Sequence, residues 1–103
     1  MNNDYYAFKE IKENPITLDF TGCKYLGEIH NILKEKFGLP DYYGANWDAL
    51  WDCLRYLFDD PVTVNIIGIQ SLSIDLQDAC KKMIEVFNDV QEETPEFTYR
   101  IMD

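Results

Sequence analysis

The pattern of hydrophobic and polar residues along the chain predicts three β-strands. Residues 16–20 (ITLDF) alternate between apolar and polar side chains and are followed by Gly22, which is typical of a strand. Residues 62–67 (VTVNII) are rich in β-branched side chains and end at Gly68, and residues 97–102 (FTYRIM) alternate again. Long connections separate the three predicted strands.

Helical periodicity fills those connections. Between residues 26 and 37, apolar side chains recur at positions 26, 29, 32, 33 and 37, and Gly38 and Pro40 then end the predicted helix. A short helix is expected at 71–78. A longer helix follows it and ends before Pro95, because apolar residues recur at helical intervals from position 79 to position 90.

A further helix is predicted after residue 46. Asn46 has the side chain of a typical N-cap, and the loop at 41–45 contains Gly44, which is available for a backbone conformation that other residues resist. Asp48 and Asp52 fall on one face of this helix, with Arg55 and Tyr56. The opposite, apolar face comprises Trp47, Leu50, Trp51, Leu54, Leu57 and Phe58.

The predicted element order is therefore β-α-α-β-α-α-β. Strands separated by long helical connections pair in parallel through right-handed crossovers, which predicts an α/β fold with helices packed on a three-stranded parallel sheet. A chain of 103 residues is long enough for one compact core. We expect a single domain over residues 1–103, in which residues 1–14 form an irregular or partly helical N-terminal extension.

The composition of the chain indicates the cellular compartment in which the protein is expected. No apolar run approaches the roughly 20 residues of a membrane-spanning helix, and the N-terminus lacks the basic and apolar regions of a secretory signal. We therefore expect a cytoplasmic protein with no membrane contact. Cys23, Cys53 and Cys80 are odd in number and form no CxxC pair, which favours reduced, buried thiols over disulfides or metal ligands.

The charge indicates a kind of partner. Nineteen acidic and nine basic residues give a formal net charge of −10. Such a field repels nucleic acid and anionic membranes and attracts basic proteins. We expect no direct nucleic-acid binding. A basic protein partner is one interpretation of the charge, but acidity that only keeps the protein soluble explains the charge count alone better.

Aromatic and acidic side chains are concentrated in residues 39–54 (LPDYYGANWDALWDCL). Asp48 and Asp52 are four residues apart on the predicted helix, so they project side by side, and Trp51 borders both helix faces. Tyr42 and Tyr43 precede the helix in a loop. Such aromatics beside carboxylates are typical of a protein-binding surface, but the spacing agrees equally well with tryptophans in the core and solvated aspartates.

A second acidic run lies near the end of the last predicted helix. A solvated helix face usually explains such a run. Asp89 nevertheless neighbours the apolar Val86, so an apolar contact with an acidic flank is available there. The run comprises Glu85, Asp89, Glu92, Glu93 and Glu96.

The sequence does not predict an enzyme. Asp48 and Asp52 share one helix face, which supplies neither the separated pKa values nor the cleft that paired catalytic carboxylates need. His30 is the only histidine, so we expect it to be structural rather than part of a metal site or a triad. The chain contains no phosphate-binding loop, nucleophile elbow or metalloprotease motif, and we expect no cofactor, metal or small-molecule substrate.

Residues 39–54 closely resemble the signature of the barstar family, intracellular inhibitors of secreted bacterial ribonucleases. Weaker similarity runs from residue 16 through the helix at 83–89 to the last strand, and the family has the same element order. The resemblance implies a barstar-like fold and a one-to-one complex, in which the loop and second helix enter the active-site groove of a basic ribonuclease. Acidic side chains then take the places of RNA phosphates.

The resemblance also implies roles for individual residues. Asp52 matches the carboxylate that occupies the phosphate site of the nuclease, and Tyr42 matches the aromatic that packs on its catalytic histidine. Asp48 matches a second carboxylate that faces basic groups, and Asp89 stands where the family has a glutamate. Further matched contact positions are Tyr43, Gly44, Asn46, Trp51 and Val86.

Four positions depart from the family pattern. Tyr56 replaces a glycine, Leu57 a tryptophan, Ala45 an acidic residue and Trp47 a leucine. A bulky residue at position 56 either blocks a familiar nuclease or fits a different one.

The expected function is a ribonuclease inhibitor that acts by occlusion and protects the producing cell. One alternative keeps the acidic surface but changes the partner: an immunity protein for a basic toxin that is not a ribonuclease, or an acidic regulator of a nucleic-acid-binding protein. A third hypothesis is an enzyme that uses Asp48 and Asp52.

Overall fold

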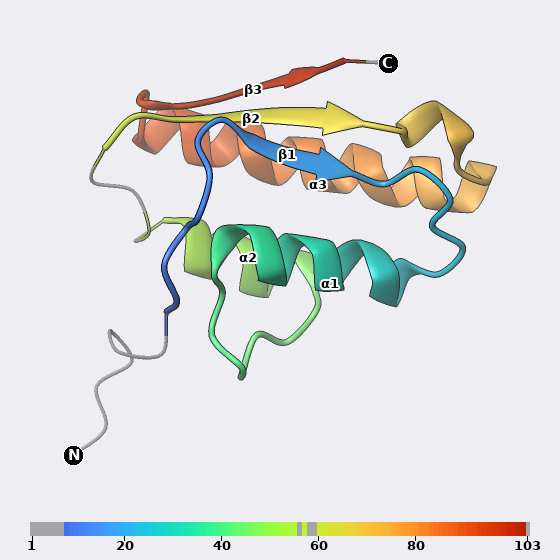
Figure 1. Ribbon diagram of the computed structural model, residues 1–103, viewed down its shortest axis with the longest axis horizontal. Coiled ribbons are helices and arrows are strands. Elements are labelled where there is room, and N and C mark those ends of the chain that lie inside the picture. The colour runs from blue at the N-terminus through green and yellow to red at the C-terminus, as the bar shows by residue number, and fades with distance from the viewer. Residues whose placement is uncertain (1–7, 56, 58–59, 103) are drawn as a thin grey trace.

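The described residues form one three-stranded sheet and three α-helices in a computed structural model of the chain (Figure 1). These residues are 8–55, 57 and 60–102. The expected α/β class and parallel sheet are confirmed. In chain order the elements are β1 (Ile16–Asp19), α1 (Leu26–Phe37), α2 (Trp47–Leu54), β2 (Val62–Ile67), the 3₁₀ turn η2 (Ile69–Ser71), α3 (Ile74–Glu93) and β3 (Phe97–Ile101).

The order of the strands explains the two-layer architecture. The strands pair in parallel in the order β1-β2-β3, with Ile16 opposite Val64 and Val62 opposite Phe97. Both connections step across the sheet in the same direction, and crossovers of one hand then place their helices on the same face. Figure 1 shows α1, α2 and α3 on one side of the sheet. A single core therefore lies between the sheet and the helices.

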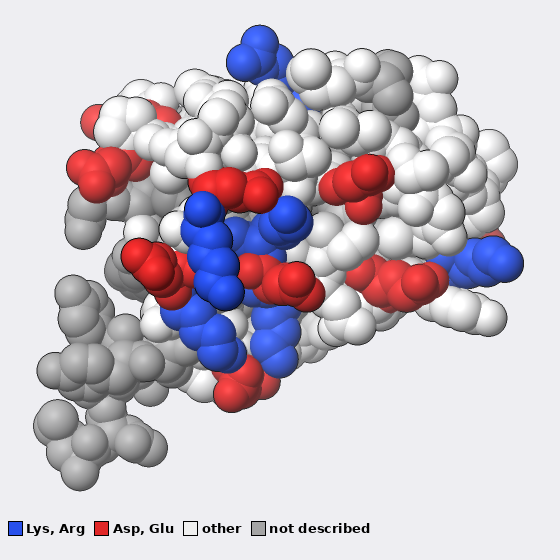
Figure 2. Space-filling view, in the orientation of Figure 1, with Lys and Arg blue, Asp and Glu red and all other residues white. Residues whose placement is uncertain are grey.

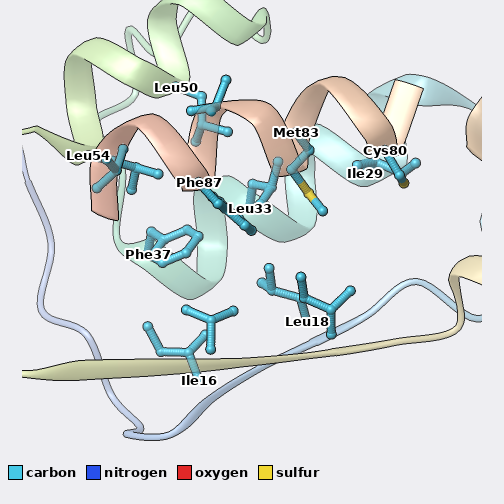
Figure 3. Close-up of a cluster of buried hydrophobic side chains, with 14 of the residues drawn as sticks. Ile16, Leu18, Ile29, Leu33, Phe37, Leu50, Leu54, Cys80, Met83 and Phe87 are labelled. Atoms are coloured by element: carbon cyan, nitrogen blue, oxygen red, sulfur yellow. The ribbon is translucent and has the colours of Figure 1, made fainter. Parts of the chain in front are cut away.

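Side chains along the strands alternate between this core and the opposite face of the sheet. Ile16 and Leu18 of β1 are fully buried, whereas Thr17 between them is half-buried. Figure 3 shows Ile16 and Leu18 facing a cluster of helix side chains that includes Leu33 and Phe37 of α1. The same cluster contains Leu50 and Leu54 of α2 and Cys80, Met83 and Phe87 of α3.

The N-terminal segment is tied to the end of α1. Gly38 follows α1 with a left-handed φ of 64°, as the predicted helix end requires, and its carbonyl accepts a hydrogen bond of 2.7 Å from the Lys9 amide. Phe8 and Ile11 are half-buried against the core. Residues 8–14 form no helix or strand, in agreement with an irregular extension, and residues 1–7 lie outside the described residues.

The prediction of two helices between β2 and β3 was wrong. One continuous helix, α3, covers residues 74–93, so the order of the described elements is β-α-α-β-α-β. The Ser73 hydroxyl accepts a hydrogen bond from the Leu76 amide and begins α3, and no Gly or Pro interrupts the helix afterwards. The residues before Ser73 form the turn η2 instead. No helix in the described ranges is long and apolar enough to cross a membrane.

The three cysteines are free thiols. Cys53 and Cys80 are buried and Cys23 is half-buried. Burial raises the pKa of the Cys80 thiol to about 11, so this thiol stays protonated at neutral pH. The expectation that the cysteines are largely buried is confirmed.

An alanine at position 38 is expected to destabilise the protein, because Gly38 has a positive φ and a Cβ there would collide with the Lys9 carbonyl. Gly27, in the first turn of α1, has nothing within 4 Å of an added Cβ and supplies the matched control. Denaturant unfolding should show Gly38→Ala less stable by more than about 1 kcal/mol. Gly27→Ala should be unchanged or more stable by up to about 1 kcal/mol. Equal stabilities for the two variants would contradict this account.

Candidate functional site

Helix α2 presents two carboxylates to solvent because its opposite face is anchored in the core. Leu50 and Leu54 are fully buried, and Cys53 is 8% exposed. Asp48 and Asp52 are both exposed and lie about one helical turn apart. The predicted amphipathic helix is therefore confirmed over residues 47–54, but its expected continuation through residues 55 and 57 was wrong. Arg55 is the C-cap of α2 and Leu57 lies in a turn, while residues 56 and 58 lie outside the described residues.

The start of α2 is set by its N-cap. The Asn46 side-chain oxygen accepts a hydrogen bond of 2.8 Å from the Ala49 amide, which confirms the predicted cap. The expectation that Gly44 adopts a special backbone conformation was wrong, because Ala45 is the residue with a positive φ, 51°. A Cβ at Gly44 would lie 3.2 Å from the Asn46 side-chain nitrogen, so glycine there leaves room for the cap. Gly44 and Asn46 are both exposed.

His30 connects α1 to the loop that precedes α2. Its side chain is 3% exposed, and its Nδ1 atom lies 2.7 Å from the Tyr43 hydroxyl oxygen. The imidazole ring also lies against Trp47, with ring centroids 4.5 Å apart. Burial lowers the pKa of His30 and raises the pKa of Tyr43. His30 is thus buried and hydrogen-bonded, as expected of a structural histidine.

The predicted contact residues divide into exposed and buried ones. Tyr42 is 59% exposed, and Asp89 is exposed on α3, which packs against α2. Tyr43 and Val86, by contrast, are only 9% and 8% exposed. Asp89 therefore lies on a helix that packs against the helix that carries Asp52, whereas Tyr43 and Val86 are placed where they support neighbouring side chains more than they offer surface of their own.

Trp51 is held by a contact that sequence inspection missed. The Arg55 guanidinium lies 5.1 Å from the centre of the Trp51 ring, and Arg55 Nε lies 3.6 Å from a carboxylate oxygen of Glu93 on α3. The four-residue spacing of Trp51 and Arg55 is the signal that could have revealed this pair. The spacing left open whether the two tryptophans belong to the core or to a binding surface. Trp47 and Trp51 are both half-buried, so each belongs partly to both.

Basic side chains gather on a different part of the molecule. Figure 2 shows lysines interspersed with acids over the face formed by the N-terminal segment and α1. Lys9 and Lys34 there lie 2.6 and 3.8 Å from Asp41, and the Lys9 ammonium holds the pKa of the Asp41 carboxyl below its usual range. By contrast, residues 42–60 contain one basic residue, Arg55, and residues 83–96 contain none. Acidic side chains on α2 and the second half of α3 therefore carry an excess of negative charge.

These features together are typical of a protein-binding domain. A helix with one face buried in the core displays two carboxylates beside half-buried aromatics, and an exposed tyrosine precedes it in the chain. Within the described residues, no group of three or more His, Cys, Asp and Glu side chains is placed to hold a metal ion. The predicted contact residues that are exposed or half-buried are together called the acidic surface below: Tyr42, Gly44, Asn46, Asp48, Trp51, Asp52 and Asp89.

Comparison with known proteins identifies the family. The family described as "Barstar (barnase inhibitor)" matches residues 13–101, and this chain belongs to the barstar family. The chain is also similar to "Putative ribonuclease inhibitor YrdF" of Bacillus subtilis (strain 168), with 36% identity over 78 residues that cover 76% of this chain and 86% of that protein. The family indicated by residues 39–54 is thus confirmed, and both comparisons point to an inhibitor rather than an enzyme.

The stability of the protein is expected to fall as the pH drops from 6.5, because burial lowers the pKa of His30 below its ordinary value of 6.5. Between the folded and unfolded pKa values of His30, the unfolded chain binds a proton that the folded state excludes. The stability that depends on a neutral His30 is therefore complete above pH 6.5 and is lost as the pH falls through the lower, folded pKa. Urea unfolding at a series of pH values from about 7 to 5 should show a slope of at most about 1.4 kcal/mol per pH unit.

His30→Gln is the control for this pH dependence. Glutamine is neutral throughout the range and still offers a hydrogen-bonding group to the Tyr43 hydroxyl. The variant should show a flat stability profile between pH 6.5 and 5. A slope as steep as that of the wild type would show that a different group is responsible.

Proposed function

We propose that this protein inhibits a basic, secreted ribonuclease by inserting the acidic surface into its active-site groove. The observation that carries the proposal is the pair of exposed carboxylates, Asp48 and Asp52, on a helix whose other face is buried in the core. Membership of the barstar family and the name of the Bacillus subtilis relative support a ribonuclease as the partner.

Electrostatics explains how such a surface blocks an enzyme that binds RNA. A ribonuclease groove is lined with basic groups that hold phosphates, and carboxylates at fixed positions satisfy the same groups. Asp48 and Asp52 are fixed because Leu50 and Leu54 anchor their helix. Occlusion needs neither a cofactor nor turnover, because the exposed side chains only have to fill the groove.

The residues of the acidic surface take distinct roles in the proposal. Asp52 occupies the phosphate site of the nuclease, and Asp48 faces further basic groups at the groove. Tyr42, with 59% of its surface exposed, packs on the catalytic histidine. Asp89 pairs with a basic group from α3. Gly44, Asn46 and Trp51 complete the contact, and the buried Tyr43 and Val86 support it from within.

The proposed complex contains one inhibitor and one nuclease, because a single surface on each molecule is engaged. The inhibitor acts in the cytoplasm, where it protects the producing cell from nuclease that has not been exported. A formal net charge of −10 favours the approach of a basic enzyme.

Asp52→Ala is expected to weaken nuclease binding at least roughly thirtyfold, because a hot-spot carboxylate removed from a basic pocket costs about 2 kcal/mol or more. The partner is the secreted ribonuclease of the producing organism, captured on the immobilised protein, with barnase as a second probe. Calorimetry measures the affinity, and thermal unfolding should be nearly unchanged because Asp52 is exposed.

Glu35→Ala is the matched control, since Glu35 is an exposed acid on α1, outside the acidic surface. It removes the same charge and should bind almost as tightly as the wild type. If Asp52→Ala binds as tightly as Glu35→Ala, then Asp52 has no role in the interface. Capture of a basic protein without ribonuclease activity would instead favour the immunity-protein alternative.

Association with the nuclease is expected to depend strongly on salt, because the acidic surface attracts a basic groove over distances that ions screen. Raising the ionic strength from about 0.02 to 0.5 M should slow association by roughly tenfold or more and change dissociation much less. Stopped-flow fluorescence of the tryptophans measures both rates. The double variant Asp48→Asn and Asp52→Asn should show a weaker salt dependence, and an equal dependence would locate the steering charge elsewhere.

A further inference from the structure

One buried polar side chain lies against the segment that carries much of the acidic surface. His30 on α1 is 3% exposed and is the only polar or charged residue that is buried in the described part of the chain. Burial of a polar group is unfavourable unless it forms hydrogen bonds, and a wholly apolar residue would avoid that cost. The role of His30 is therefore sought in its contacts with Tyr43 and Trp47.

Both contacts of His30 are with the same short segment. Its Nδ1 atom and the Tyr43 hydroxyl are hydrogen-bonded at 2.7 Å, and its ring centroid lies 4.5 Å from that of Trp47, at an interplanar angle of 41°. Burial is the only cause that lowers the pKa of His30, and no charged side chain contributes to the shift. The ring is therefore neutral at neutral pH.

The two contacts hold both ends of a turn. Tyr43 and Trp47 flank residues 44–46, and within them Ala45 has a φ of 51°, a conformation that alanine adopts only where the surrounding structure maintains it. Tyr42 and Asp48 are the residues just outside the two anchors, and both are exposed. The positions of these two side chains thus depend on the anchors.

We propose that His30 is a positioning residue for nuclease recognition: through Tyr43 and Trp47 it locks residues 42–48 in the conformation that meets the partner. The inference rests on the proposed function, because the positioned side chains are those assigned to the interface. A segment that is ordered before binding loses less conformational entropy when the complex forms, so His30 increases affinity without touching the nuclease.

A hydrogen bond provides this positioning better than apolar packing does. Apolar side chains pack in several orientations of similar energy, whereas the hydrogen bond requires the Tyr43 hydroxyl to point at one ring nitrogen. The bond therefore selects one orientation of the loop. A residue that only filled space would stabilise the core to a similar extent and leave the loop less defined.

Three variants separate positioning from stability: Tyr43→Phe, His30→Leu and the double variant. Each single variant leaves one buried polar group unpaired and should lower stability, while the double variant removes both partners and should recover much of the loss. Affinity for barnase and for the captured ribonuclease should be about tenfold weaker in all three variants. Leu76→Ala, a buried site in the first turn of α3, should lose stability and keep wild-type affinity.

The affinity of the double variant distinguishes a positioning role of His30 from a purely structural one. If its affinity returns to the wild-type value together with its stability, His30 is merely a structural core residue and the proposal is overturned. Weak binding in a stable double variant supports positioning.

Amide hydrogen exchange of the free protein tests the same inference without a nuclease. Exchange of the amides at 44–49 should be about tenfold faster in the double variant than in the wild type, while the amides of β2 exchange as before. Unchanged exchange at 44–49 would overturn the positioning role even if the nuclease is bound. A different outcome is that the wild type binds no ribonuclease while the amides at 44–49 still exchange faster in the double variant. This result would overturn the proposed function and leave the ordering of the loop by His30 established.

Discussion

Three phenylalanine rings join the two layers of this protein. Phe37 of α1, Phe87 of α3 and Phe97 of β3 are fully buried, and their ring centroids are 5.4 to 6.5 Å apart. Such aromatic pairs add about 0.5–1.5 kcal/mol each beyond the burial of their area. The cluster fixes the end of α1, and the loop to α2 begins there. The position of the whole loop therefore depends on this contact.

Because the core lies on one face of the sheet, each helix packs one side against it and has another side that the core does not need. Helix α2 has only eight residues, a length at which an isolated helix is unstable, so packing rather than helix propensity maintains it. Burial of Leu50 and Leu54 contributes about 1.5–3 kcal/mol for each side chain. Repulsion between like charges four residues apart costs only about 0.2–0.5 kcal/mol. The core therefore tolerates Asp48 and Asp52 on the exposed side of the same helix.

Periodic patterns predicted the fold where one pattern extended over a whole element. The predicted bounds of α1 and β2 agree with the structure, because each has a clear period and a glycine at its end. The prediction failed at α3, where the true start is a serine cap rather than a change in period. In the candidate site, too, only local features could be predicted from the sequence. The N-cap at Asn46 could be predicted from residue type, whereas the positive φ of Ala45 depends on how the loop is held at both sides.

The sequence by itself determined the family, the acidic charge and the face of α2 on which Asp48 and Asp52 lie, because each follows from residue type and local spacing. Only the tertiary structure decided which residues meet across elements. Tyr43 bonds to His30 from thirteen residues away, and Arg55 reaches Glu93 on another helix. A helical period states which way a side chain points, but the docking of elements on the shared core determines what it meets. That is why Tyr43, which looked like a surface aromatic beside Tyr42, is an internal support of the loop.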